Sequence, residues 1–344
     1  MMGAWRPRVV LVSSAEKSVT IDPCHLARYV AAAALLWLTA SAADAQPAAV
    51  SPFPRNLSGT LVFQSDVRTA SNPNARAKIY SIDLGTGRVS TVTREGDWSD
   101  EQPRWSPDGQ GIAFKSNRGG SYNLYVMNAD GGNVRRLTNH AGNDHDPSWL
   151  PDGESFVFAS DRDRGVGRYD LYRYWLADGS VERLTTFFNG YAFMPNVSPD
   201  GGWVAFVATT FPYDGGYANQ VHVLELATKQ TWPFDVTAPG CWPNWSPDGQ
   251  SIAHVSLLNE DPSTIQKISS FGTDPEPIPG EPARWHYYPD WSPDNRLLAV
   301  SVSPEHHQGE NWDLAILDPT RATPLRRLTT GDGNDRLPDW KPRD

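Results

Sequence analysis

The sequence predicts an all-β protein, a six-bladed β-propeller built from four-stranded blades. The chain has 344 residues, and one short phrase, Pro-x-Trp-Ser-Pro-Asp-Gly or a variant of it, occurs six times, starting at Pro103, Pro147, Pro195, Pro243, Pro289 and Pro338. Successive copies lie 44, 48, 48, 46 and 49 residues apart. A period in the forties with several short strands per repeat is typical of propeller blades. No stretch after residue 45 has a helical period of apolar residues.

Residues 103–138 illustrate how one repeat is expected to fold. Trp105 ends a first strand at the turn Pro107-Asp108-Gly109, where proline presets φ and glycine accepts positive φ. The pair Asp130-Gly131 is a hairpin signal before a polar outer strand. The remaining strands are expected at 112–114, 124–127 and 134–138.

The other repeats follow the same pattern. Their second strands are expected at Ser155–Ala159, Trp203–Ala208, Ser251–Val255 and Leu297–Val302. Their third strands are expected at Asp170–Tyr174, Gln220–Leu224, Thr264–Ile268 and Asp313–Leu317. The tryptophans of the repeated phrase are expected to pack between blades, because large aromatic residues are usually highly buried.

The two ends of the repeat array predict how the ring closes. Three expected strands, Thr60–Gln64, Lys78–Ile82 and Val89–Thr93, precede the first copy of the phrase, and the last copy stands at the end of the chain. We expect Pro338–Trp340 to supply the inner strand of the first blade. Closure of this kind protects strand edges that an open array would expose.

The first 45 residues are expected to be a signal peptide. Arg28 precedes the apolar stretch Tyr29–Thr39, and the small residues that follow end in Ala43-Asp44-Ala45, a typical cleavage site. The apolar stretch is too short to span a membrane, so we expect a periplasmic or secreted protein with no integral membrane span. Residues 46–56 are then a short linker, and residues 57–344 form the propeller.

The composition excludes several classes of function. The net charge of −10 argues against nucleic acid and anionic membrane surfaces as partners. A Gly-x-Ser-x-Gly nucleophile motif and a phosphate-binding glycine loop are both missing from the sequence. We therefore expect a monomeric binding protein that needs no cofactor and performs no catalysis.

Residues 103–138 and 147–185 also point to a family. The order Pro-x-Trp-Ser-Pro-Asp-Gly, Ile-Ala-Phe-x-Ser-x-Arg, Leu-Tyr-Val, Asp-Gly-Gly and Arg-Leu-Thr resembles the propeller repeat of TolB-like proteins. The resemblance implies an exported propeller that binds a protein or ligand over its central channel. The same repeat occurs in Tol-Pal proteins, in peptidase propellers and in some polysaccharide lyases, so it is more specific for fold than for function. TolB carries an α/β domain ahead of its propeller, and we expect none in this chain.

The candidate binding site lies on the segments that lead into the inner strands, around one mouth of the channel. These segments are rich in acidic and aromatic residues, which suit recognition of a protein or an envelope polymer. The alternative is that the same side chains fill space between blades and cap turns. The candidates are Asp100, Asp144, Asp146, Tyr191, Trp242, His286, Tyr287 and Asp335.

The histidines leave a second possibility open. His145, His286 and His306 are candidate ligands of a divalent metal such as Zn²⁺ or Mn²⁺, and the acidic residues beside His145 suggest Ca²⁺. Their spacing matches no established ligand motif. If they do converge, the alternative function is a metal-assisted polysaccharide lyase or hydrolase with its site over the channel.

Overall fold

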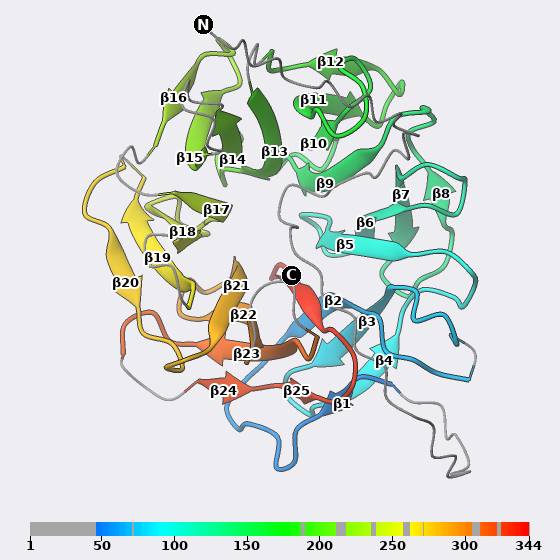
Figure 1. Cartoon of the computed structure of the whole chain (residues 1–344), viewed down its shortest axis with the longest axis vertical. Helices are drawn as coiled ribbons and strands as arrows, with labels where there is room; N and C mark the ends of the chain where they lie inside the picture. The colour runs from blue at the N-terminus through cyan, green and yellow to red at the C-terminus, as the bar shows by residue number, and fades with distance from the viewer. Residues whose placement is uncertain are drawn as a thin grey trace, which may run out of the picture. The chain divides into compact units, whose positions relative to one another are not determined.

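Six four-stranded antiparallel sheets surround one axis in the computed structural model (Figure 1). The structure describes residues 46–70, 72–186, 190–210, 218–234, 239–256, 262–270, 272–304, 310–321 and 325–343. All of these residues belong to the compact unit that spans residues 37–344. The expected signal peptide, residues 1–45, lies outside them, and no helix within them is long and apolar enough to cross a membrane.

The blades follow one another along the chain, and each is built from the inside of the ring outward. Blade 1 contains β26 (Arg336–Trp340), β2 (Thr60–Ser65), β3 (Lys78–Asp83) and β4 (Val89–Thr91). Blade 2 contains β5 (Asp100–Trp105), β6 (Gly111–Ser116), β7 (Asn123–Asn128) and β8 (Arg135–Arg136). Blade 3 contains β9 (Asp144–Trp149), β10 (Ser155–Ser160), β11 (Asp170–Trp175) and β12 (Val181–Arg183). Blade 4 contains β13 (Gly190–Val197), β14 (Trp203–Thr210), β15 (Ala218–Glu225) and β16 (Thr231–Pro233). Blade 5 contains β17 (Gly240–Trp245), β18 (Ser251–Ser256), β19 (Thr264–Ser269) and β20 (Glu276–Ile278). Blade 6 contains β21 (Trp285–Trp291), β22 (Leu298–Ser303), β23 (Asp313–Leu317) and β24 (Arg326–Arg327).

The predicted closure of the ring is confirmed. Strand β26, from the C-terminal end, pairs antiparallel with β2, and Trp340 stands opposite Leu61. Each inner strand also contacts the inner strands of both neighbouring blades, including β21 with β26 and β26 with β5. A further pair that the sequence did not indicate lies outside the six blades: β1 (Ala48–Ala49) pairs with β25 (Thr329–Thr330).

The Ser-Pro-Asp-Gly turns explain why the phrase is repeated. In four blades the aspartate Oδ1 accepts a hydrogen bond from the serine hydroxyl at 2.5 to 2.6 Å, as in Ser106–Asp108 and Ser246–Asp248. Such side-chain bonds fix the turn together with its backbone bond, as where the Gly109 N–H donates to the Ser106 carbonyl at 2.8 Å. The final glycine has positive φ, 65° at Gly109, and in blade 6 Asn295 adopts the same conformation with φ 62°. Asparagine is among the few residues that tolerate it.

The outer strands are shorter than predicted. The expected strand 134–138 contracts to Arg135–Arg136, because the N–H groups of Leu137 and Thr138 both donate to the carbonyl of Leu124 and end the ladder. The same arrangement, in which two consecutive N–H groups donate to one carbonyl, shortens the expected strand Val89–Thr93 to Val89–Thr91.

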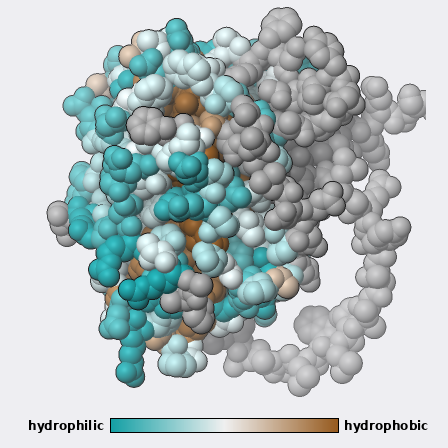
Figure 2. All heavy atoms as spheres, turned by 90° about the vertical axis from the view of Figure 1, so that its left-hand side faces the viewer, coloured by the Kyte–Doolittle hydropathy of each residue, from teal (hydrophilic) through white to brown (hydrophobic). Residues whose placement is uncertain are grey.

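The core lies mostly between blades. Trp105 packs with Val62 and Ile79 of blade 1, and Trp340 packs with Ala299 and Ile316 of blade 6. The surface in Figure 2 is largely hydrophilic, with hydrophobic residues visible mainly in recesses. Burial of these apolar faces between neighbours stabilises the ring, at roughly 25 cal/mol per Å².

Candidate functional site

A β-bulge interrupts the inner strand of every blade directly before its proline. Six residues there adopt left-handed backbone conformations with φ between 52° and 57°, and their pairing with the second strand shifts register: Gln102, Asp146, Met194, Trp242, Tyr288 and Leu337. None is glycine, so each conformation costs about 1 kcal/mol or more that the fold must offset. Bulges re-aim side chains and often stand beside functional sites.

The bulge residues of blades 2 and 3 join a polar arc. Gln64 accepts the N–H of Gln102 at 2.9 Å, and Gln102 accepts the N–H of Asp146 at 2.8 Å. The Gln102 amide also donates to the Asp146 carboxylate, which accepts the N–H of Met194 at 3.2 Å. The first bond joins β2 of blade 1 to the inner strand of blade 2, and the others join consecutive inner strands, so these side chains stabilise the ring from blade 1 to blade 4.

The bulge residues of blades 4 to 6 form an apolar arc instead. The rings of Trp242 and Tyr288 meet edge to face, with their centroids 4.6 Å apart. Both are only partly buried, as are Met194 and Phe193, which pack against the same core cluster. Of the six bulge residues, two thus present hydrogen-bonding groups and three present aromatic or thioether surface, while Leu337 of blade 1 is buried.

Two predicted binding residues, Asp100 and Asp144, lie inside the blades. Both are fully buried, and each pairs with the arginine of the Ser-x-Arg segment at the end of the second strand: Arg118 at 2.7 Å and Arg162 at 2.9 Å. Asp144 also accepts the Ser160 hydroxyl at 2.6 Å. These carboxylates join the first two strands of their own blades.

Asp335 holds the equivalent position in blade 1, but without an arginine. Val67 stands where blades 2 and 3 have Arg118 and Arg162. Asp335 is 3% exposed, and its Oδ1 has no hydrogen-bond partner among the described residues. Burial raises the pKa of Asp335 to about 7, against smaller opposing effects of hydrogen bonds from Ser65 and Thr329. This carboxyl is therefore poised to change its protonation near neutral pH.

The other predicted residues differ in accessibility. Tyr191 and Asp146 are partly buried, whereas His286 and Tyr287 are buried. The Nε2 atom of His286 accepts the N–H of Glu281 at 3.1 Å, and the ring of Tyr287 packs edge to face on Trp312. At the apolar arc, Tyr288 rather than Tyr287 is the neighbour of Trp242.

The candidate metal ligands do not come together in the described part of the chain. His145 is on β9 of blade 3 and His286 on β21 of blade 6, on opposite sides of the ring (Figure 1). His306 lies outside the described residues. Among the residues that are described, no three or more His, Cys, Asp or Glu side chains are grouped so as to hold a metal ion.

His145 belongs to a different cluster, which the sequence interpretation missed. The Lys115 ammonium lies 3.1 Å from both Glu101 Oε2 and His145 Nδ1, while the Tyr122 hydroxyl donates to Glu101 at 2.7 Å and the Tyr169 hydroxyl lies 3.3 Å from His145 Nε2. Burial, and then the charge of Lys115, hold the pKa of His145 well below its usual value, so the imidazole is neutral. The signal in the sequence was Lys115 itself, a lysine in an apolar strand where blades 3 and 5 have Ala159 and Val255.

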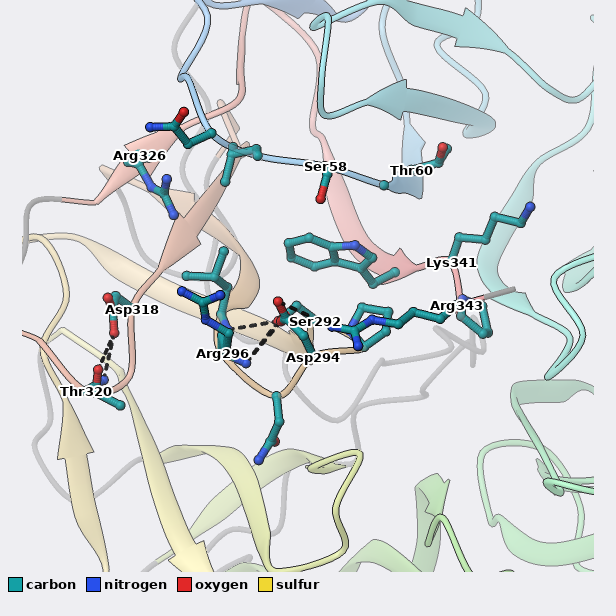
Figure 3. Close-up of a pocket in the computed structure, with 18 of the residues that line it drawn as sticks. Ser58, Thr60, Ser292, Asp294, Arg296, Asp318, Thr320, Arg326, Lys341 and Arg343 are labelled. Atoms are coloured by element: carbon teal, nitrogen blue, oxygen red, sulfur yellow. Dashed lines mark hydrogen bonds and ion pairs between the residues drawn. The ribbon is translucent and has the colours of Figure 1, made fainter.

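Pockets open at the opposite end of the inner strands, between the Pro-Asp-Gly turns of neighbouring blades. One of about 970 Å³ lies at the closing seam between blades 6 and 1 (Figure 3). Two acidic side chains in its lining, Asp294 and Asp318, already accept hydrogen bonds from their own turns. The cationic residues of the lining outnumber them: Arg296, Arg321, Arg326, Lys341 and Arg343. In an acidic protein, this is the described pocket best suited to an anionic group.

Comparison with known proteins identifies the fold family. Residues 67–232 match the family model described as the TolB beta propeller domain. The chain carries a TolB-like β-propeller. This propeller is similar to the crystal structure of TolB from Acinetobacter baumannii, with a TM-score of 0.67 and 20% identity over 85% of this chain and 69% of that one. It is also similar to an oligogalacturonate lyase in complex with manganese, with a TM-score of 0.50 and 16% identity over 80% and 74% of the two chains. At such identities the likeness establishes the fold alone.

Two sequence relatives match part of the TolB-like repeat array. A TolB homologue of Chlorobium luteolum is 29% identical over 170 residues, which is 49% of this chain and 36% of that protein. An uncharacterised protein of Agrobacterium fabrum is 34% identical over 137 residues, covering 38% and 46% of the two chains. The chain thus spans less than half the length of either relative.

Proposed function

We propose that this TolB-like propeller is an exported binding protein that captures a partner protein at the end of the ring where the inner strands begin. The observation that carries the proposal is the apolar arc of Met194, Trp242 and Tyr288. Three consecutive inner strands present these side chains from equivalent bulge positions, and all three are partly exposed. Partly exposed aromatic side chains on a rigid scaffold are typical anchors of protein recognition.

The polar arc supports the same proposal from the other half of the ring. Its hydrogen bonds hold the bulges of blades 2 to 4 in place, so Met194, at one end of the apolar arc, is presented without a large ordering cost on binding. An envelope polymer is the alternative ligand for the same arc. Export through cleavage of residues 1–45 would bring the propeller to either kind of partner.

The test replaces residues of the apolar arc with the residue that another blade carries at the equivalent position. In the variant Trp242→Gln with Tyr288→Gln, the apolar arc receives the side chain that Gln102 has at the blade 2 bulge. We expect capture of partners from an envelope extract to fall by about tenfold or more, since each lost aromatic anchor can contribute on the order of 2 kcal/mol. The control Val181→Gln alters an exposed apolar side chain on the outer strand of blade 3 and should leave capture unchanged.

Equal capture by the double variant and the wild type would refute the proposal. Treatment of the bound material with protease or glycosidase distinguishes a protein from a polymer. Metal analysis of the same preparation tests the remaining alternative, because stoichiometric metal that is lost in His145→Ala would support a metal-assisted enzyme instead.

A further inference from the structure

A second pocket at the turn end of the ring lies between blades 4 and 5 and is lined by tryptophan. Its volume is about 810 Å³, and Trp203, Trp232 and Trp245 contribute to its wall. The rings of Trp203 and Trp232 are 5.9 Å apart at an angle of 52°. The volume is within the range of small-molecule binding sites. The pocket is separate from the partner site proposed above, which is at the other end of the inner strands.

The repeated blades show which of these residues the fold does not require. Trp232, on the outer strand β16, pairs with Val223 and is 40% exposed. The same position in the other blades is polar or charged: Ser90, Arg135, Glu182, Glu276 and Arg326. An exposed tryptophan on an edge strand invites association and adds little to the core, so folding does not account for it.

Trp203 departs from the repeat in the same way. It begins the second strand of blade 4, where the other blades have Thr60, Gly111, Ser155, Ser251 and Leu297. Blade 4 therefore has two extra tryptophans on adjacent positions of one surface. The third, Trp245, is the usual packing residue of the repeated phrase, but its indole N–H has no hydrogen-bond partner among the described residues. In blades 3 and 6 the equivalent N–H groups donate to Arg104 and Asn244 carbonyls.

The polar residues of the lining define the chemistry of the ligand. They include Asp200, Asp248 and Gln250, and none of the described lining residues is a lysine, arginine or histidine. The turn fixes Asp200 through Oδ1, which accepts the Ser198 hydroxyl at 2.5 Å and the Gly202 N–H at 3.0 Å. Those bonds lower the pKa of Asp200 and keep it ionised, so the pocket repels anions.

Aromatic faces beside carboxylate and amide groups suit a ligand with both an apolar face and many hydroxyl groups. A pyranose ring has this character: its C–H face packs on an indole, and its hydroxyls donate to carboxylates and accept from N–H groups. We propose that the pocket between blades 4 and 5 binds an uncharged glycan segment, with sugar rings packed on Trp203 and Trp232. Asp200, Asp248 and Gln250 supply hydrogen bonds.

A pocket of the same kind elsewhere in the ring provides an internal comparison. Between blades 2 and 3 the turns enclose about 750 Å³, with Gly111 and Arg135 at the positions of Trp203 and Trp232. That pocket is formed by the same turns of neighbouring blades but lacks the pair of aromatic faces. The variant Trp203→Ser with Trp232→Arg therefore gives blade 4 residues that blades 3 and 2 already carry.

The experiment measures binding of purified full-length protein to cellotetraose, maltotetraose and chitotetraose by isothermal titration calorimetry. We expect at least one of these uncharged tetrasaccharides to bind the wild type. The double variant should bind it about tenfold or more weakly, which corresponds to 1.4 kcal/mol. The single variant Trp232→Arg should weaken binding as well. Because this edge position is exposed, the single variant should fold even if the double variant does not, and the test can still be interpreted.

Several outcomes would overturn the proposal. One is that none of the three tetrasaccharides binds the wild type. Another is that binding is unchanged in both tryptophan variants while their thermal melting matches the wild type. A third is that the wild type is a dimer by sedimentation and the variants are monomers without any sugar binding, which would assign the tryptophans to self-association. The Trp242→Gln, Tyr288→Gln variant should retain sugar binding, so failure of the partner site and failure of the glycan site are distinguishable.

Discussion

The carboxylate of Asp339 accepts the backbone N–H of Trp105 at 2.6 Å, although the two residues are 234 positions apart in the sequence. Its other oxygen accepts the Arg104 guanidinium at 3.0 Å. On the opposite side of the same strand, Asp290 accepts the N–H of Trp340 at 2.7 Å. The last strand of the chain is thus joined by carboxylates to both neighbouring blades, and the seam depends on them.

The first prediction concerns this seam. Asp339→Ala leaves the Arg104 charge mostly buried without its partner, and we expect it to lower the free energy of unfolding by about 3 kcal/mol. Truncation before Pro338 removes the last three residues of β26, exposes most of the edge of β2, and should cause a larger loss or aggregation. Chemical denaturation measures both effects.

The matched control for the seam is Ser148→Ala. Ser148 accepts the N–H of Val197 between blades 3 and 4 at 3.0 Å, but no charge depends on it. Its loss should cost about 1 kcal/mol. If the truncated chain melts like the wild type, closure by β26 does not stabilise the ring.

The second prediction concerns pH and Asp335. The pKa of Asp335 is raised to about 7 in the folded protein, so the unfolded chain loses this proton at lower pH than the folded one does. Stability from this group is therefore full below about pH 4 and is lost as pH rises to about 7, by up to about 4 kcal/mol. Asp335→Asn removes this pH-dependent loss of stability. The variant should therefore melt several degrees above the wild type at pH 8 and at nearly the same temperature at pH 4.

Asp144→Asn is the control for the pH prediction, because the same substitution there removes the charge that Arg162 pairs with. It should destabilise the protein at every pH where Asp144 is ionised in the wild type. Melting curves from pH 4 to 8 test both variants. A wild-type stability that stays level over this range, with no gain in Asp335→Asn, would contradict the prediction.

The third prediction concerns His145. Burial and Lys115 depress its pKa, so the imidazole should stay neutral at pH 5.5, where an ordinary histidine is mostly charged. Lys115→Met removes the neighbouring charge and should raise the pKa of His145. Ring chemical shifts in NMR titrations measure this directly, and a histidine in a model peptide serves as the reference. Titration of His145 in the wild type at the pH of the model peptide would disprove it.

The fourth prediction concerns export. The mature protein should begin at Gln46, because cleavage after Ala45 follows the small-residue pattern Ala43-Asp44-Ala45. N-terminal sequencing of the protein from the periplasm or medium tests this. Ala45→Leu should block cleavage and leave a larger precursor. A mature chain that retains residues 29–45 would rule out the predicted signal peptide.

Parts of the candidate site could be predicted from the sequence because they belong to the repeat. The prolines place an inner strand in each blade, and Asp100 and Asp144 occur at equivalent steps before them. The role of those carboxylates could not be predicted in the same way, because Arg118 and Arg162 lie just beyond the end of the second strand and become their partners only when the first two strands pair. The choice between Tyr287 and Tyr288 likewise depended on a bulge that reverses the alternation of the strand.

The sequence by itself determined the all-β class, the six blades, the closing strand and the turns, because each follows from local backbone preferences repeated at a regular interval. Only the tertiary structure decided which side chains meet across blades. The polar and apolar arcs, the cluster at Lys115 and the tryptophan pocket each combine residues from separate blades or strands, and the curvature of the ring brings them together. That curvature cannot be predicted from the local sequence, because the curvature arises from the packing of complete blades against one another.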